Sequence, residues 1–80
     1  QRHGVYGEWC VVPETGVTTV PERLSRIEAA AVWQQYLTAY GPLVEYTRLD
    51  ASKSVLVTAG ASSVGLGAIQ VAKLLGATVI

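Results

Sequence analysis

The sequence has no excess of charge of either sign. Six acidic residues balance six lysine and arginine residues, so the formal net charge at pH 7 is zero. Proteins that bind nucleic acid neutralise its phosphates with a basic surplus, which this sequence does not have. The composition therefore argues against nucleic acid as a partner.

Long hydrophobic runs and a leader-like N-terminus are also missing. A membrane-spanning helix needs about 20 consecutive apolar residues, but Gln70, Lys73 and Thr78 interrupt the most apolar part of the chain. The first residues are polar and show no apolar core followed by a small-residue cleavage site. We therefore expect no membrane association and a cytoplasmic location.

Cysteine and histidine each occur once, as Cys10 and His3. One thiol cannot form a disulfide within the chain, and neither residue has further ligands at the spacing of a zinc site. We expect Cys10 to be a half-buried residue on a strand, and we assign no metal-binding role to His3.

Apolar residues, in contrast, make up half of the sequence, which is enough for a packed core. Residues 4–12 are rich in β-branched and aromatic side chains, which predicts a strand that ends at Pro13. A short strand over residues 17–20 is a further option in the turn-rich stretch that follows. Trp9 and Trp33 are expected in the core.

Two helices are predicted in the middle of the chain. Ser25 and Glu28 have the S-x-x-E spacing of a capping box and precede three alanines, which predicts a helix over residues 26–35. A second helix is predicted over residues 38–49, with Pro42 tolerated in its first turn.

The last 26 residues predict a β-α-β unit. Residues 55–59 form a continuous apolar run, which is typical of a strand buried on both faces in a parallel sheet. A helical stripe of apolar residues begins at Val64, and Gly76 is expected to end that helix in the left-handed conformation. Residues 77–80 then begin a second strand, so the fold class is α/β.

The turn between the first strand and its helix has the pattern G-x-S-x-x-G, formed by Gly60, Ser62 and Gly65. In dinucleotide-binding folds the first glycine of this motif permits a tight turn, the second admits the pyrophosphate and the third brings the helix close to the strand. The helix N-terminus then offers amide donors to the phosphates. Ser62 should hold a phosphate slightly further away than glycine, and its hydroxyl could donate to a phosphate oxygen. A turn shaped only by packing is the alternative.

Two dehydrogenase families compete for this motif. The short-chain dehydrogenases have T-G-x-x-x-G-x-G, but the glycines here are Gly60, Gly65 and Gly67, so the first spacing is one residue too long. That family also begins near its first strand, whereas 54 residues precede the strand here.

The whole stretch from Gly4 to Ile80 resembles the medium-chain dehydrogenase/reductase superfamily, above all its zinc-independent quinone oxidoreductase (zeta-crystallin-like) branch. The resemblance lies in "EAAA", "TAY" and "VGLGAIQVAKLLGA" and in their order along the chain. It implies that residues 1–24 end a GroES-like substrate domain, that residues 25–53 are linker helices, and that residues 54–80 begin a Rossmann-type doubly wound parallel sheet.

The resemblance also implies site residues. The pyrophosphate loop corresponds to Gly60, Ala61, Ser62, Ser63, Val64 and Gly65, with Val64 also near the nicotinamide ring. Thr38 corresponds to a threonine near the nicotinamide, although a helix N-cap would explain the same residue. Gln34 occupies the position of a zinc-ligand cysteine in the zinc-dependent alcohol dehydrogenases, and glutamine is a poor zinc ligand. We therefore expect no zinc.

The function implied is hydride transfer from NADPH, with NADH as the alternative, to a quinone, enone or similar carbonyl of a small-molecule substrate. An enoyl reductase domain, a zinc-type alcohol dehydrogenase and a non-catalytic structural piece remain alternatives. We assign no catalytic residue: the spacing of Tyr36, Tyr40 and Tyr46 favours packing over proton donation. We expect the sequence to be a piece of a longer, homodimeric enzyme and to show no turnover by itself.

Overall fold

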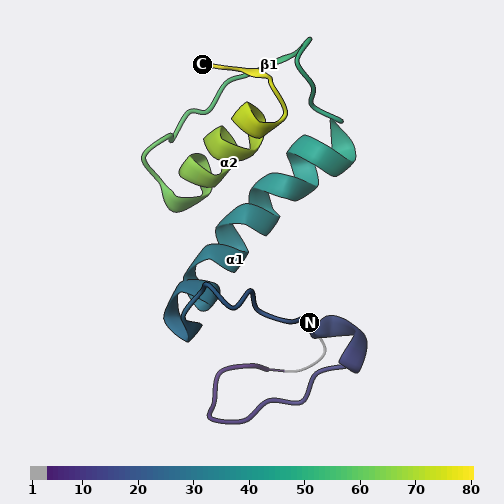
Figure 1. The fold of residues 1–80 in the computed structure, drawn as a ribbon, viewed down its shortest axis with the longest axis vertical. Coiled ribbons are helices and arrows are strands. Elements are labelled where there is room, and N and C mark those ends of the chain that lie inside the picture. Colours follow the sequence, from purple (N-terminus) through teal and green to yellow (C-terminus); the bar gives the residue numbers. More distant parts are fainter. Residues whose placement is uncertain (1–3) are drawn as a thin grey trace.

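The structure is a computed structural model that describes residues 4–80, so His3 lies outside the described residues. Its elements follow the order η1 (Glu14–Gly16), α1 (Arg26–Tyr40), η2 (Gly41–Tyr46), β1 (Ser54–Val55), α2 (Ser63–Leu74) and β2 (Thr78–Val79). The molecule is elongated, with extents of 44 × 24 × 24 Å. Figure 1 shows α2 beside α1, with the N-terminal segment, in purple, beyond the end at which α1 begins.

Helix α1 begins at Arg26, as the capping box predicts. The Ser25 hydroxyl accepts the Glu28 amide at 3.2 Å, and the Glu28 carboxylate accepts the Ser25 amide at 2.8 Å. The bond from the Ser25 amide, followed by that from its side chain, holds the pKa of the Glu28 carboxyl below its usual range. Both hydrogen bonds of the predicted capping box are therefore present.

The predicted division into two helices is wrong. Helix α1 runs on to Tyr40 and passes directly into η2, a wider turn with Pro42 near its start. No residue between Gln35 and Thr38 breaks the helical hydrogen bonds, and Pro42 is tolerated because it lies in the first turn of η2. The helical path also ends at Tyr46, three residues earlier than predicted.

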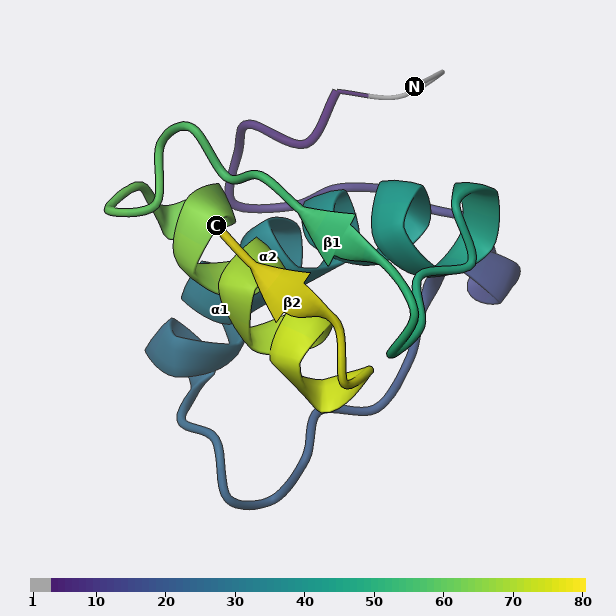
Figure 2. The ribbon, with the colours of Figure 1, turned by 90° about the horizontal axis from the view of Figure 1, so that it is seen from above.

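The β-α-β unit is confirmed. Strands β1 and β2 pair in parallel, with Ser54 opposite Thr78 and Val55 opposite Val79, and Figure 2 shows them side by side over α2. Both strands are only two residues long, but the Val57 amide still reaches the Ile80 carbonyl at 2.9 Å. Main-chain pairing thus continues for a short distance past β1, as expected for the start of a larger parallel sheet.

Gly76 ends α2 as predicted. Its φ of 77° is in the left-handed region, which favours glycine. The Gly76 amide donates to the Lys73 carbonyl at 3.0 Å, and the Ala77 amide donates to the Ala72 carbonyl at 3.0 Å. This pair of bonds is a Schellman motif, and it turns the chain back toward β1.

The core is small and lies in the C-terminal half. Leu49, Ala72 and Ala77 are its buried members, and the partly buried Leu43, Val55, Leu75 and Val79 pack against them. The prediction that residues 55–59 are buried on both faces is wrong for this chain, because Leu56 is 68% exposed. One face of β1 packs on α2, and the other has no cover among residues 4–80.

The predicted strands in the N-terminal segment are absent. Residues 4–12 and 17–20 form no strand among residues 4–80, and the assignment of residues 1–24 to a GroES-like domain stays a prediction. A strand needs a partner to satisfy its main-chain hydrogen bonds, and this segment finds none in the described chain. Trp9 is 92% exposed, Trp33 is 54% exposed and Cys10 is exposed, in place of the expected core and half-buried positions.

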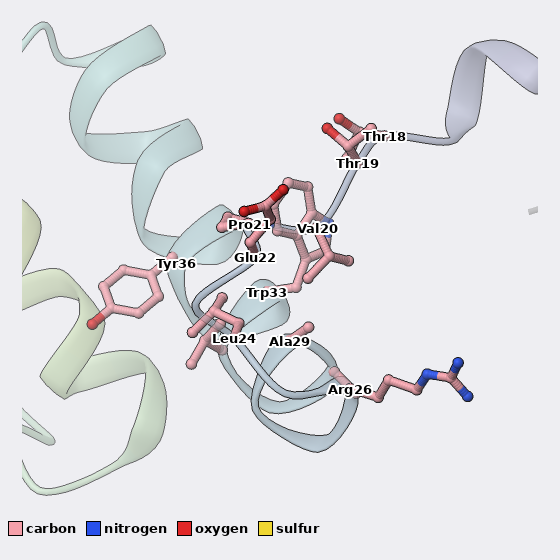
Figure 3. A pocket seen from close by; sticks show the side chains of 12 residues that line it. Thr18, Thr19, Val20, Pro21, Glu22, Leu24, Arg26, Ala29, Trp33 and Tyr36 are labelled. Carbon is pink, nitrogen blue, oxygen red and sulfur yellow. The ribbon is translucent and has the colours of Figure 1, made fainter.

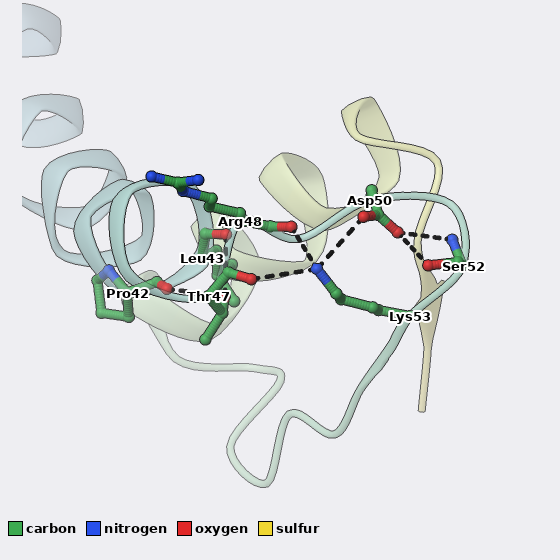
Figure 4. A network of polar contacts seen from close by, with 7 residues as sticks. All are labelled: Pro42, Leu43, Thr47, Arg48, Asp50, Ser52 and Lys53. Carbon is green, nitrogen blue, oxygen red and sulfur yellow. Dashed lines mark hydrogen bonds and ion pairs between the residues drawn. The ribbon is translucent and has the colours of Figure 1, made fainter.

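A polar network fixes the turn between η2 and β1 (Figure 4). The Lys53 ammonium donates to the carbonyls of Thr47 at 3.2 Å and Arg48 at 2.6 Å, and it pairs with the Asp50 carboxylate at 3.2 Å. The Asp50 carboxylate also accepts the amide and the hydroxyl of Ser52. The Ser52 side-chain bond, then its amide bond, then Lys53 hold the pKa of Asp50 below its ordinary value of 3.8.

This network predicts a pH dependence. A carboxyl whose pKa is lowered by folding stabilises the native state above its unfolded pKa, and the contribution is lost as pH falls through the folded value. Stability attributable to Asp50 should therefore be present above pH 3.8 and disappear below it. In chemical denaturation, Asp50→Asn should remove this loss on acidification, whereas Glu45→Gln, which deletes an equal charge outside the network, should retain it. Parallel pH profiles for the wild type and Asp50→Asn would contradict the assignment.

Gly65 supplies a second prediction. A β-carbon built on Gly65 would lie 2.1 Å from the Ala59 carbonyl oxygen, whereas one on Gly60 would meet only the end of Ile69 at 3.4 Å. Gly65→Ala should therefore destabilise the protein by about 1–3 kcal/mol, because main chain must move to admit the methyl group. Gly60→Ala is the matched control and should melt close to the wild type. Equal melting temperatures for both variants would show that Gly65 does not approach the Ala59 carbonyl so closely.

Candidate functional site

The loop between β1 and α2 closes on itself before the helix begins. The Ser62 amide donates to the Ala59 carbonyl at 3.0 Å, and the Ser62 carbonyl accepts the first helical bond, from the Leu66 amide at 2.8 Å. Ser62 has the extended conformation of an N-cap, with φ −74° and ψ 160°. The start of α2 is thus tied back to Ala59, in the stretch that follows β1.

The hydroxyl of Ser62 is used inside the loop. Its oxygen accepts a hydrogen bond from the Gly65 amide at 3.0 Å, and its O–H donates to the Ala59 carbonyl at 2.7 Å. A serine hydroxyl has one proton, so donation to a phosphate, as the sequence suggested, would require the Ala59 bond to break. The structure gives Ser62 a capping role in place of that contact.

Two main-chain donors remain at the start of α2. The first turn of any α-helix leaves its amides without helical acceptors, and here Ser62 satisfies only that of Gly65. The amides of Ser63 and Val64 have no hydrogen bond among residues 4–80, and both residues are exposed. Together with the partial positive charge of a helix N-terminus, they can bind an anion.

The two end glycines of the motif have different roles. Gly65 is buried, and its missing side chain lets α2 start against Ala59, which is the packing role expected of the third glycine. Gly60 does not have a positive φ, since Gly76 is the only glycine with one among residues 4–80. The tight turn therefore does not require glycine at position 60 on conformational grounds.

A depression of about 330 Å³ joins this loop to α1. Thr38 lines it together with Ser62, Val64 and Gly65, whereas Gly60, Ala61 and Ser63 do not. The N-cap explanation of Thr38 is wrong: the residue lies inside α1, and its hydroxyl donates to the Gln34 carbonyl at 2.7 Å. Four of the seven predicted site residues therefore meet at one hollow, although Thr38 is distant from the other three in sequence.

The tyrosines lie elsewhere. The Tyr36 hydroxyl donates to the side-chain oxygen of Gln70 and so links α1 to α2, which fits the packing role. Tyr46 is 88% exposed, and neither Tyr40 nor Tyr46 lines the depression. No acid or base can be assigned to a tyrosine from this arrangement.

A larger hollow was missed by sequence reasoning. About 860 Å³ lies between residues 18–24 and the first turns of α1, and Figure 3 shows Trp33 and Leu24 at this hollow. The sequence signal that could have found it is the apolar Val20, Pro21 and Leu24 just before the capping box. Its lining is mainly apolar, although it includes Arg26 at the start of α1, and it contains none of the predicted site residues. The loop therefore remains the better candidate for binding an anionic ligand.

Metal and membrane sites have no support in the described chain. No group of three or more His, Cys, Asp or Glu side chains lies close enough to hold a metal ion among residues 4–80. Over the same residues, no helix has the length and apolar character needed to cross a bilayer.

The sequence of this chain is similar to those of several known proteins. The chain is 49% identical over 69 residues to the highly reducing polyketide synthase sor1 of Hypocrea jecorina, covering 86% of this chain and 3% of that protein. It is 40% identical over 78 residues to a quinone oxidoreductase-like protein 2 homolog of Nematostella vectensis, covering 96% and 21%. It is 35% identical over 77 residues to a quinone oxidoreductase of Pongo abelii, covering 96% and 23%.

The chain thus spans less than a quarter of each of these relatives. No family model and no solved structure matches it. Its relatives nevertheless agree with one another, because the quinone oxidoreductases and the matching polyketide synthase regions share one superfamily. Its similarity in sequence to these relatives shows that this chain belongs to the medium-chain dehydrogenase/reductase superfamily.

Proposed function

We propose that the protein carrying this sequence transfers hydride from NADPH to a quinone, an enone or a similar conjugated carbonyl, with NADH as the alternative donor. The observation that carries the proposal is the pair of amides at Ser63 and Val64 that have no hydrogen bond among residues 4–80, beside a hollow lined by Thr38. The names of two relatives, quinone oxidoreductase and its homolog, support the acceptor class.

The residues of the loop fit a dinucleotide. The Ser63 and Val64 amides donate to the diphosphate, and the lack of a side chain at Gly60 and the single methyl group of Ala61 leave the approach open. Val64 and Thr38, which line the depression together, face the nicotinamide end. The bound cofactor supplies the hydride, while the protein orients it and excludes water.

An enoyl reductase domain within a polyketide synthase is the second candidate. It is favoured by the 49% identity to sor1 and by 42% identity over 78 residues to the polyketide synthase sorA of Penicillium rubens. The cofactor chemistry would be the same, but the acceptor would be an α,β-unsaturated thioester. A zinc-type alcohol dehydrogenase is disfavoured because Gln34 takes the place of a thiolate ligand. A purely structural role would require no dinucleotide binding at all.

The remaining assignments follow from the same proposal. We propose a cytoplasmic protein that acts as a homodimer on a small-molecule substrate, without nucleic acid or zinc. The absence of net charge agrees with a partner other than nucleic acid.

The proposed anion site predicts the effect of removing one donor. Ser63→Pro deletes the first amide of α2 while keeping a residue that is favoured at this helix position. Ser62 already has the extended ψ of 160° that a residue before proline requires. A hydrogen bond to a charged group contributes about 1.5–3 kcal/mol, so NADPH affinity measured by calorimetry should fall at least about tenfold.

Arg26→Pro is the matched control for this experiment. It deletes the corresponding first amide of α1, whose N-cap Ser25 is extended in the same way, with ψ 163°. The control should bind NADPH as the wild type does. Unchanged binding by Ser63→Pro would contradict the anion site, and no binding of NADPH or NADH by the wild type would favour the structural role.

The acceptor class and the metal can be tested in one assay. The complete protein that carries this sequence should oxidise NADPH with a quinone, and treatment with a chelator should leave the rate unchanged because Gln34 offers no thiolate. An enoyl thioester reduced much faster than any quinone would favour the polyketide synthase alternative. Loss of the rate on chelation, restored by added zinc, would contradict the zinc-free proposal.

A further inference from the structure

Ser62 stands where the dinucleotide-binding motif has its middle glycine, and its hydroxyl faces into the loop. We propose that Ser62 is a positioning residue, which braces the loop before the dinucleotide arrives and makes no side-chain contact with the diphosphate. This inference rests on the proposed dinucleotide site, which family membership supports independently of the helix end.

The geometry fixes what the hydroxyl can do. The Ala59 carbonyl accepts from both the amide and the hydroxyl of Ser62, at 3.0 Å and 2.7 Å. The same hydroxyl accepts the Gly65 amide at 3.0 Å. One side chain therefore connects Ala59, four residues past the end of β1, to the first turn of α2, across the loop between them.

The brace acts where the packing is closest. Gly65 already approaches the Ala59 carbonyl so nearly that a β-carbon would overlap it, and Ser62 bonds to both of these residues. A glycine at position 62 would leave the loop free to sample other conformations. Holding it in one shape before binding reduces the entropy lost when the ligand is captured.

The brace also limits the recognition of the phosphates. Because Ser62 uses the Gly65 amide, the anion is left with the amides of Ser63 and Val64 alone. Recognition at this end of the ligand would then depend on main-chain donors, and the serine would affect affinity only through the shape of the loop.

The test compares three variants of the complete protein. Ser62→Ala removes the brace and keeps the β-carbon, Ser62→Thr restores the hydroxyl, and Ser25→Ala removes the corresponding N-cap from α1. Losing an N-cap serine predicts a Kd for NADPH about fivefold to tenfold higher in Ser62→Ala. Ser62→Thr should stay within about twofold of the wild type. Ser25→Ala should lose comparable thermal stability without a change in Kd.

Amide hydrogen exchange separates a brace from a direct contact. In the wild type without ligand, the Gly65 amide should already be protected, and NADPH should add protection at Ser63 and Val64. In Ser62→Ala without ligand, the Gly65 protection should be lost. The wild-type measurement needs no substitution, so it remains decisive if Ser62→Ala fails to fold.

The outcomes are distinguishable. Rapid exchange of the Gly65 amide in the free wild type, or an unchanged Kd in Ser62→Ala, would overturn the brace while leaving the proposed function intact. Protection of Gly65 in a wild type that binds neither NADPH nor NADH would overturn the proposed function, and with it the role of Ser62 in binding.

Discussion

The approach of Gly65 to the Ala59 carbonyl is the contact on which the arrangement of the site depends. Any β-carbon at position 65 would overlap main-chain atoms of Ala59. The start of α2 can therefore lie against Ala59 only with glycine at position 65. That approach brings the loop, the helix N-terminus and the depression together. It also means that a bulky substitution at Gly65 disturbs folding as well as binding, so such a variant cannot isolate the contribution of the ligand contacts.

The packing of α1 on α2 provides the other wall of the site. Gly67 lies close to the Gln35 carbonyl, where a β-carbon would be 3.2 Å from the oxygen. The Tyr36–Gln70 hydrogen bond joins the same two helices. Thr38 lies about one turn beyond Gln35 on α1. The contacts between the two helices therefore also determine how near Thr38 comes to Val64. Residues whose side chains never face the depression thus set its width.

Local signals in the sequence predicted local structure well. The capping box at Ser25, the left-handed Gly76 and the small-residue turn before α2 each depend on interactions a few residues apart, and all three are present. A strand over residues 4–12 would need a partner strand from outside the segment, so the composition of these residues alone could not decide whether it forms. The direction of the Ser62 hydroxyl was equally hidden, because a sequence gives the donor but not the acceptor that it chooses. The cofactor-binding roles of Thr38 and residues 60–65 stay predictions.

The hydrogen bond inside α1 at Thr38 has a chemical consequence for whatever enters the depression. The only hydroxyl proton of Thr38 goes to the Gln34 carbonyl at 2.7 Å, so toward any further partner this oxygen can only accept a hydrogen bond. A ligand group that meets this oxygen must bring its own proton, as a carboxamide nitrogen does and a bare carbonyl does not. In the proposed site, this fixed polarity of Thr38 would select which way round a planar amide can lie against it.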